Sequence, residues 1–243
     1  SGTVMGYNFI KYGLGGPFYL KVTHKSFMPM QIVSFFCGAL GLYGMLYLNP
    51  LAYLVLLMLV VFTALYGLPI FPAQKNLRAI KGMKIYIVAI VWALATVVLP
   101  LSTLGVKMVL QLTNSSDPFG FVGVLGLFLS HFFLVLALMV PFELRDYLED
   151  TPQLATLPQR YGLQKTKYIG IFWSLLFLGG HLFAGAILKW PIQIVGVSLM
   201  ITLLLIIGIF YSGKHSSSYF TDFWVEGIPI LFAFLWWAFE SFL

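Results

Sequence analysis

Four of the eight acidic residues in this chain lie within eight positions, at the end of a long apolar run. The segment reads Pro141-Phe142-Glu143-Leu144-Arg145-Asp146-Tyr147-Leu148-Glu149-Asp150. If the segment is helical, a rotation of about 100° per residue places Glu143, Asp146 and Asp150 within an arc of roughly 60°. Three such carboxylates repel one another unless a cation lies among them, and carboxylate oxygens suit a Mg²⁺ that also bridges to a phosphate. The spacing therefore predicts a Mg²⁺ site, and the alternative is a solvated helix end whose charges mark the membrane interface.

Two histidines fall near the middle of apolar runs, where an ionisable side chain is usually buried and partnered. They are His131 and His181. We expect their rings to pair with each other across adjacent helices, and the alternative is a role in catalysis or proton transfer. Four tryptophans lie towards the ends of apolar runs, where interfacial belts would place them. These are Trp190, Trp224, Trp236 and Trp237.

The composition describes a chain that resides in a bilayer. Of 243 residues, 60% are hydrophobic and only 9% are charged, and the mean hydropathy is +0.94. A soluble domain needs more surface charge, so a water-soluble enzyme, a disordered tail and a nucleic-acid-binding module are all disfavoured. Cys37 is the single cysteine, which excludes an internal disulfide and a cysteine-clustered metal site.

Seven apolar runs are each long enough to cross about 30 Å of hydrocarbon as a helix. They cover residues 27–48, 51–71, 85–106, 119–142, 168–188, 191–211 and 223–243. Residues 1–12 resemble the end of an eighth helix, because their apolar positions are followed by a glycine and proline cluster. We expect an all-α polytopic bundle that forms a single transmembrane domain over residues 1–243. We also expect at least one N-terminal span to be missing from this sequence.

Basic residues orient the chain in the membrane. If loops alternate between sides, those at 13–26, 72–84, 143–167 and 212–222 share one side. With Lys11 included, this side carries twelve of the 14 lysines and arginines: Lys11, Lys21, Lys25, Lys75, Arg78, Lys81, Lys84, Arg145, Arg160, Lys165, Lys167 and Lys214. The other side carries Lys107 and Lys189. The positive-inside rule therefore predicts that the long loops and the acidic cluster are cytoplasmic.

Two sequence patterns resemble the UbiA superfamily of intramembrane prenyltransferases. Asp146-x-x-x-Asp150 is preceded by Arg145 and followed by Thr156-Leu157-Pro158-Gln159-Arg160-Tyr161-Gly162. This order is similar to the second aspartate-rich motif of that family, R-D-x-x-x-D followed by T-L-P-x-R-x-G. The segment Tyr66-Gly67-Leu68-Pro69, followed by Lys75, Arg78 and Gly82, resembles the family's Y-x-x-P stretch and basic loop. The nine-helix order of the family also fits a helix fragment followed by seven full spans.

The first aspartate motif of the family is altered in this chain. Where the family has an Asn or Asp followed by two further Asp, residues 7–15 place Asn8, Lys11 and Gly15. Asn8 matches the family pattern, whereas Lys11 and Gly15 stand where carboxylates are expected. Half of the Mg²⁺–diphosphate site is therefore changed relative to the family.

The resemblance implies Mg²⁺-dependent transfer of an isoprenoid from its diphosphate to a lipophilic, usually aromatic acceptor within the membrane. Asp146 and Asp150 would serve catalysis and, with Glu143, hold the metal. The resemblance and the basic loop imply four substrate-binding residues: Asn8, Lys11, Lys75 and Arg78. For Lys75 and Arg78 the alternative is that they only orient the protein in the membrane. The alternative function is a non-catalytic UbiA-like protein that binds lipid or isoprenoid, or a small-molecule transporter.

Overall fold

The computed structural model describes residues 28–67, 80–103, 119–150, 154–213, 216–217 and 219–241. In these ranges all regular structure is helical, which confirms the predicted all-α class. The α-helices are α2 Met28–Met45, α3 Pro50–Gly67, α4 Lys84–Ala93, α5 Leu99–Thr103, α7 Phe119–Arg145, α8 Leu157–Tyr161, α9 Leu163–Ile187, α10 Ile192–Tyr211 and α11 Glu226–Ser241. A π-helical segment, Leu94–Val98, joins α4 to α5, and another, Phe220–Val225, precedes α11.

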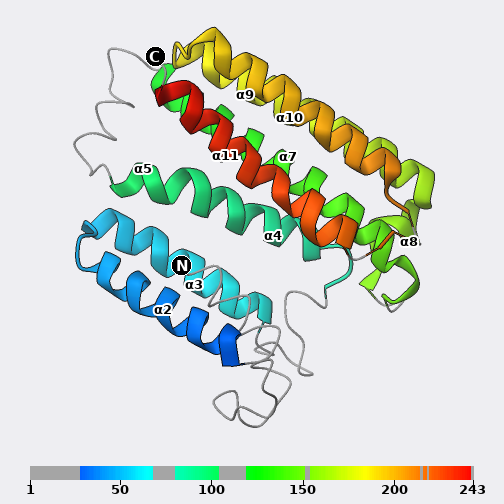
Figure 1. Cartoon of the computed structure of the whole chain (residues 1–243), viewed down its shortest axis with the longest axis horizontal. Coiled ribbons are helices and arrows are strands. Elements are labelled where there is room, and N and C mark those ends of the chain that lie inside the picture. Colours follow the sequence, from blue (N-terminus) through cyan, green and yellow to red (C-terminus); the bar gives the residue numbers. More distant parts are fainter. Residues whose placement is uncertain are drawn as a thin grey trace.

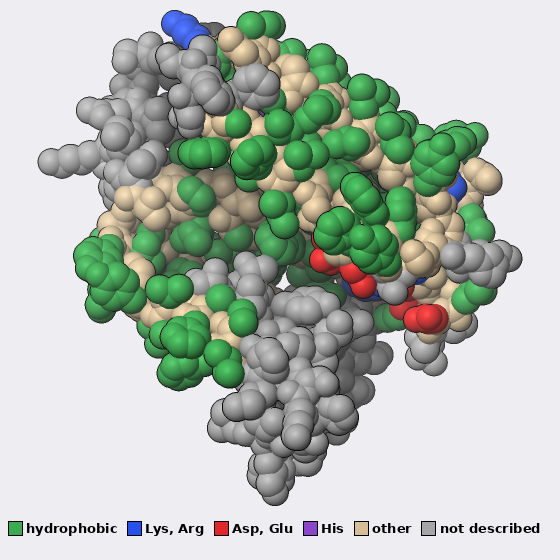
Figure 2. Space-filling model, viewed as in Figure 1, with side chains coloured by type: hydrophobic (Ala, Val, Ile, Leu, Met, Phe, Trp, Pro, Cys, Tyr) green, Lys and Arg blue, Asp and Glu red, His purple; other side chains and the backbone are tan. Residues whose placement is uncertain are grey.

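Five of these helical segments are long and apolar enough to cross a membrane. They are Pro50–Gly67, Lys84–Thr103, Gly120–Leu148, Leu163–Ile187 and Ile192–Tyr211. Helices satisfy their own backbone hydrogen bonds, which lipid requires of a spanning segment. The chain is therefore a multi-pass integral membrane protein, and in Figure 2 hydrophobic side chains cover most of the visible described surface.

The other two predicted spans are shorter as helices than as apolar runs. The run at 223–243 begins inside the π-helical segment Phe220–Val225, so α11 has 16 residues. In α2, the apolar helical part is Phe35–Met45. The expected end of an eighth helix at residues 1–12 lies outside the described residues.

Helix α7 is the centre of the bundle (Figure 1). It packs against α4 on one side and along α9 on another, while α10 packs against both α9 and α11. The buried side chains at these contacts include Leu136, Val140, Phe177, Ile201 and Leu205. Since lipid tails are as apolar as these side chains, close packing rather than escape from water stabilises such contacts.

Small residues let α7 and α9 approach each other. Gly126 and Ser130 on α7 face Gly180 and Ala184 on α9. A Cβ atom added to Gly180 would lie 3.1 Å from the Ser130 Cβ and 3.3 Å from the Gly126 carbonyl oxygen. These positions repeat every fourth residue on each helix, which is the small-xxx-small pattern of tight helix pairs in membranes.

Asn49 fastens the start of α3 to the end of α5. Its Oδ1 accepts a hydrogen bond from the Ala52 N–H at 2.9 Å, which satisfies one of the free donors at a helix N-terminus. Its Nδ2 donates to the carbonyl oxygens of Ser102 and Thr103 at 2.7 and 3.1 Å. One side chain therefore satisfies backbone groups at the ends of two helices.

Candidate functional site

The acidic cluster lies where α7 ends. The α-helix stops at Arg145 and the chain continues as a single 3₁₀ turn, Asp146–Leu148. The Asp146 carbonyl oxygen accepts hydrogen bonds from the N–H groups of Glu149 and Asp150, at 2.9 and 2.8 Å. This turn carries Asp150 back towards the helix that bears Glu143.

Glu143 and Asp150 share one cation, the ammonium of Lys84 at the start of α4. The Lys84 Nζ lies 3.5 Å from Glu143 Oε1 and 3.8 Å from Asp150 Oδ2. The side chain of Glu143 is only 2% exposed, and its Oε2 accepts a hydrogen bond from the Leu157 N–H at 3.3 Å. Within the described residues, Glu143 Oε1 and Asp150 Oδ2 are buried and accept no hydrogen bond.

Asp146 belongs to a second ionic group. Its Oδ1 accepts a hydrogen bond of 2.7 Å from the Arg145 Nε. The same guanidinium donates to Asp222 Oδ1, also at 2.7 Å, and to the Thr221 hydroxyl, which both precede α11. Arg145 therefore joins the end of α7 to the segment before the last helix.

The predicted convergence is found for Glu143 and Asp150, which share Lys84, but not for Asp146. In the part of the chain that the structure describes, no three His, Cys, Asp or Glu side chains lie close enough together to hold a metal ion. The expectation assumed that the helix continues through Asp150. Because the α-helix ends at Arg145, the 100° steps stop there, and Arg145 holds Asp146 apart from the pair at Lys84.

Two loops meet beside the Lys84 pair. The Gly82 N–H donates to the Leu154 carbonyl oxygen at 2.9 Å, and Gly82 has a φ of +69°. A Cβ atom at Gly82 would lie 3.1 Å from the Arg160 guanidinium carbon. A small cavity of about 10 Å³ lies here, lined by Gly82, Lys84, Ile85, Glu143, Leu154, Thr156 and Leu157. Such a volume has room for about one water molecule or ion.

The four predicted substrate-binding residues lie outside the described residues. They are Asn8, Lys11, Lys75 and Arg78.

Lys84 was not predicted as a member of the site, because its charge was explained by the orientation of the chain in the membrane. The available signal was its position, since Lys84 directly precedes an apolar run and lies on the same predicted side of the membrane as Glu143. Asp222, which pairs with Arg145, carried the same signal at the start of the last run.

The intramembrane histidines form a separate group. The ring centroids of His131 and His181 are 6.1 Å apart, so the two side chains are neighbours as expected. Their hydrogen bonds nevertheless go elsewhere. His131 Nδ1 lies 3.0 Å from the Leu127 carbonyl oxygen, and His181 Nδ1 lies 3.3 Å from the Ser130 hydroxyl oxygen.

Two of the tryptophans predicted at the interface also contact this histidine group. Ring centroids of Trp190 and Trp236 lie 4.9 and 5.7 Å from that of His181. Although Trp190 and Trp236 lie near the ends of their apolar runs, their rings pack against His181.

The geometry of the site thus consists of a buried carboxylate pair that shares Lys84, an adjoining ion pair at Asp146, and a remote histidine group. Comparison with protein-family models, curated proteins and solved structures finds no match for this chain.

Proposed function

We propose that this protein is a Mg²⁺-dependent intramembrane prenyltransferase of the UbiA type, which transfers an isoprenoid from its diphosphate to a lipophilic acceptor. The observation that carries the proposal is the pair of carboxylates, buried Glu143 and partly buried Asp150, around Lys84 at one end of an apolar bundle. The pair adjoins the Thr156–Gly162 segment, on which the resemblance to that family rests. In this proposal the site faces the cytoplasm, as the distribution of basic residues predicts.

The residues of the pair fit a divalent cation. Glu143 Oε1 and Asp150 Oδ2 are buried oxygens that accept no hydrogen bond in the described parts of the chain, and they face one ammonium group. Mg²⁺ commonly uses one or two protein carboxylates and completes its shell with water and substrate phosphate oxygens. Two carboxylates are therefore enough protein ligands for one Mg²⁺. The third predicted ligand, Asp146, would remain paired with Arg145 beside the metal.

Lys84 offsets part of the negative charge of the two carboxylates when no metal is bound. Two buried carboxylates without a cation would be costly, because each would lose its hydration without compensation. When Mg²⁺ and a prenyl diphosphate bind, the ammonium of Lys84 is free to turn to a phosphate oxygen. The Lys84 side chain is 17% exposed, so it is not fully enclosed by protein.

The proposed reaction breaks the C–O bond between the allylic carbon and the diphosphate. Negative charge then develops on the leaving diphosphate, and Mg²⁺ supplies the positive charge that stabilises it. Lys84 supports the same charge, together with Lys75 and Arg78, while Asn8 and Lys11 contribute from the altered first motif. The acceptor ring attacks the allylic cation and loses a proton, so the products are the prenylated acceptor and diphosphate.

A second candidate function is favoured by the position of Lys84 itself. A resident ammonium between two carboxylates can serve a non-catalytic protein that binds an isoprenoid or lipid phosphate and does not turn it over. Such a protein would bind the anion through Lys84 without needing Mg²⁺. The two functions therefore differ in the metal dependence of binding and in the release of diphosphate.

A binding titration with matched variants tests the proposal. Purified protein in nanodiscs is titrated with a geranylgeranyl thiodiphosphate analogue, with Mg²⁺ and with EDTA. Asp150→Asn should weaken Mg²⁺-dependent binding by at least about tenfold, because the metal loses a charged ligand. Glu149→Gln is the matched control, since Glu149 lies in the same turn but is exposed. His131→Ala and His181→Ala should also leave this binding largely intact.

The outcomes separate the two functions. Mg²⁺-dependent binding, together with diphosphate release when a panel of quinone precursors is supplied, supports the transferase. Binding that is equally tight in EDTA, with no diphosphate released, supports the non-catalytic protein. Equal effects of Asp150→Asn and Glu149→Gln would refute the assignment of the site.

A further inference from the structure

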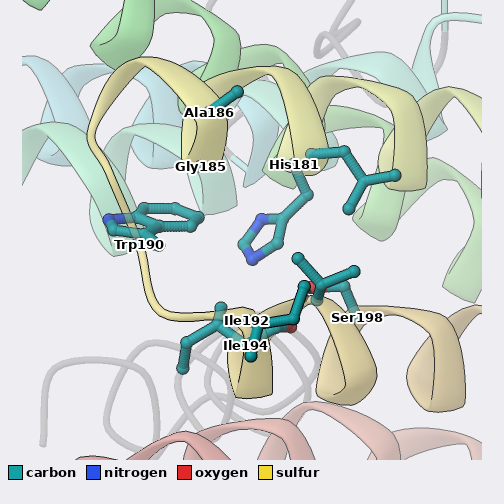
Figure 3. Close-up of a pocket in the computed structure, with 9 residues that line it drawn as sticks. His181, Gly185, Ala186, Trp190, Ile192, Ile194 and Ser198 are labelled. Carbon is teal, nitrogen blue, oxygen red and sulfur yellow. Dashed lines mark hydrogen bonds between the residues drawn. The ribbon is translucent and has the colours of Figure 1, made fainter.

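A second cavity lies at the other end of the bundle, between the end of α9 and the start of α10 (Figure 3). Its volume is about 190 Å³, and its walls include Leu182, Gly185, Trp190, Ile194 and Val195. The acidic cluster lies near the beginning of α9. That helix begins at Leu163, about 18 residues before His181, which corresponds to roughly 27 Å along the helix. The two sites are therefore separate.

His181 presents one buried polar atom to this cavity. The side chain is 1% exposed, and in Figure 3 its ring points into the space between Trp190 and Ser198. The Nδ1 atom lies 3.3 Å from the Ser130 hydroxyl oxygen, whereas Nε2 has no hydrogen-bond partner among the described residues. A buried polar atom without a partner is costly, so its position in a cavity wall favours binding of a ligand that carries a hydrogen-bonding group.

Other polar groups in the wall are already engaged. The Ser198 hydroxyl donates to the Ile194 carbonyl oxygen at 2.8 Å. No lysine, arginine, aspartate or glutamate is among the described residues that line the cavity. The site therefore suits a neutral ligand with one hydrogen-bonding group.

Aromatic rings fix the position of the imidazole. Ring centroids of Trp190, Phe232, Phe177 and Trp236 lie 4.9, 5.4, 5.5 and 5.7 Å from that of His181. Such a ring of neighbours holds Nε2 in one direction and offers π faces near a bound ring. Two further lining residues, Ala186 and Ile192, are exposed, so the cavity reaches the outer surface of the helices. A lipophilic ligand can enter there directly from the bilayer.

We propose that this cavity binds a small neutral aromatic alcohol, a phenol, whose hydroxyl group hydrogen-bonds to His181 Nε2. The size fits, because apolar cavities of about 150 Å³ accept benzene and this cavity is about 190 Å³. A hydroxyl group both donates and accepts, so it pairs with Nε2 in either tautomer of a neutral imidazole. The site does not depend on the prenyltransferase proposal, since it uses none of the acidic residues.

Two probes of nearly the same shape test the proposal. In p-xylene a methyl group replaces the hydroxyl group of p-cresol, so the pair isolates the hydrogen bond. Equilibrium dialysis with radiolabelled probes measures saturable binding to the purified full chain in detergent. Protein-free micelles supply the partition correction, and both Kd values refer to the concentration in the detergent phase. We expect p-cresol to bind about fivefold tighter than p-xylene, which corresponds to one typical net hydrogen bond.

Matched variants of the two histidines test whether the preference for p-cresol over p-xylene arises at His181. His181→Leu should bring the ratio of the two Kd values to about one while it preserves p-xylene binding. His131→Leu should keep the fivefold preference, because His131 is a neighbour of His181 but does not line the cavity.

Three results would overturn the proposal. They are no saturable binding of either probe, equal affinity for both probes in the unchanged protein, and a preference that survives His181→Leu. The comparison of probes in the unchanged protein decides the matter even if His181→Leu does not fold. Since neither probe carries phosphate, failure here is distinguishable from failure of Mg²⁺-dependent diphosphate binding.

Discussion

Two adjacent glycines of α9 should respond in opposite ways to the same substitution. A Cβ atom at Gly180 would lie 3.1 Å from the Ser130 Cβ and 3.3 Å from the Gly126 carbonyl oxygen, whereas a Cβ atom at Gly179 meets nothing within 4 Å. Neither contact of Gly180 can be relieved by rotation of a side chain, because both atoms are fixed by the backbone of α7. Gly180→Ala must therefore move α7 and α9 apart by a few tenths of an ångström.

The expected magnitudes follow from this geometry. Overpacking costs about 1–3 kcal/mol, and replacing glycine by alanine within a helix returns up to about 1 kcal/mol. Gly180→Ala should thus be destabilising by up to about 2 kcal/mol. Gly179→Ala should be neutral or stabilising by up to about 1 kcal/mol, since it gains helix propensity without a clash.

Thermal unfolding of the purified protein in detergent, followed by tryptophan fluorescence, measures the difference. For a chain of this size, 1 kcal/mol corresponds to a change in Tm of about 2–4 °C. We therefore expect Gly180→Ala to unfold several degrees below Gly179→Ala, and Gly180→Val to unfold at a lower temperature than either. Equal Tm values for the two alanine variants would refute the close approach of α7 and α9 at Gly180.

Three further substitutions test single contacts by the same unfolding assay. Asn49→Ala should cost about 2 kcal/mol, because it removes a helix cap and two hydrogen bonds to the end of α5. Asn49→Ser retains a cap acceptor without placing a charge against the two carbonyl oxygens and should cost less. Arg145→Met should cost about 1 kcal/mol or less, since its partner Asp222 is 57% exposed, and a loss that did not shrink at high salt would contradict a surface ion pair. Gly82→Ala should cost about 1–2 kcal/mol, because a φ of +69° is unfavourable for alanine and its Cβ would crowd Arg160; an unchanged Tm would show that this loop adopts another backbone conformation.

The helices of this protein are determined largely by local sequence. The apolar runs predicted at 51–71, 168–188 and 191–211 correspond to α3, α9 and α10, with ends displaced by up to five residues. In lipid, a spanning segment must satisfy its backbone within itself, so length and hydropathy alone predict a helix. The ends differ because capping and π-helical turns depend on individual residues, as at Phe220–Val225 before α11.

The grouping of charges was decided by tertiary structure. The sequence placed Glu143, Asp146 and Asp150 within eight positions and predicted one site. The fold divides them between Lys84 and Arg145, because α7 ends where the sequence pattern gave no helix stop. Whether two such carboxylates and Lys84 hold Mg²⁺ stays a prediction.

The histidine cavity was also beyond the reach of sequence patterns. The sequence predicted that His131 and His181 would be neighbours inside the bundle, because a bilayer leaves few other places for an imidazole. The structure places them side by side, with His181 buried and His131 partly buried. It did not predict that Trp190 and Trp236 face His181, nor that Ser130 occupies its Nδ1. Hydropathy specifies which segments enter the membrane, but the direction of each side chain depends on how helices far apart in the chain pack against one another.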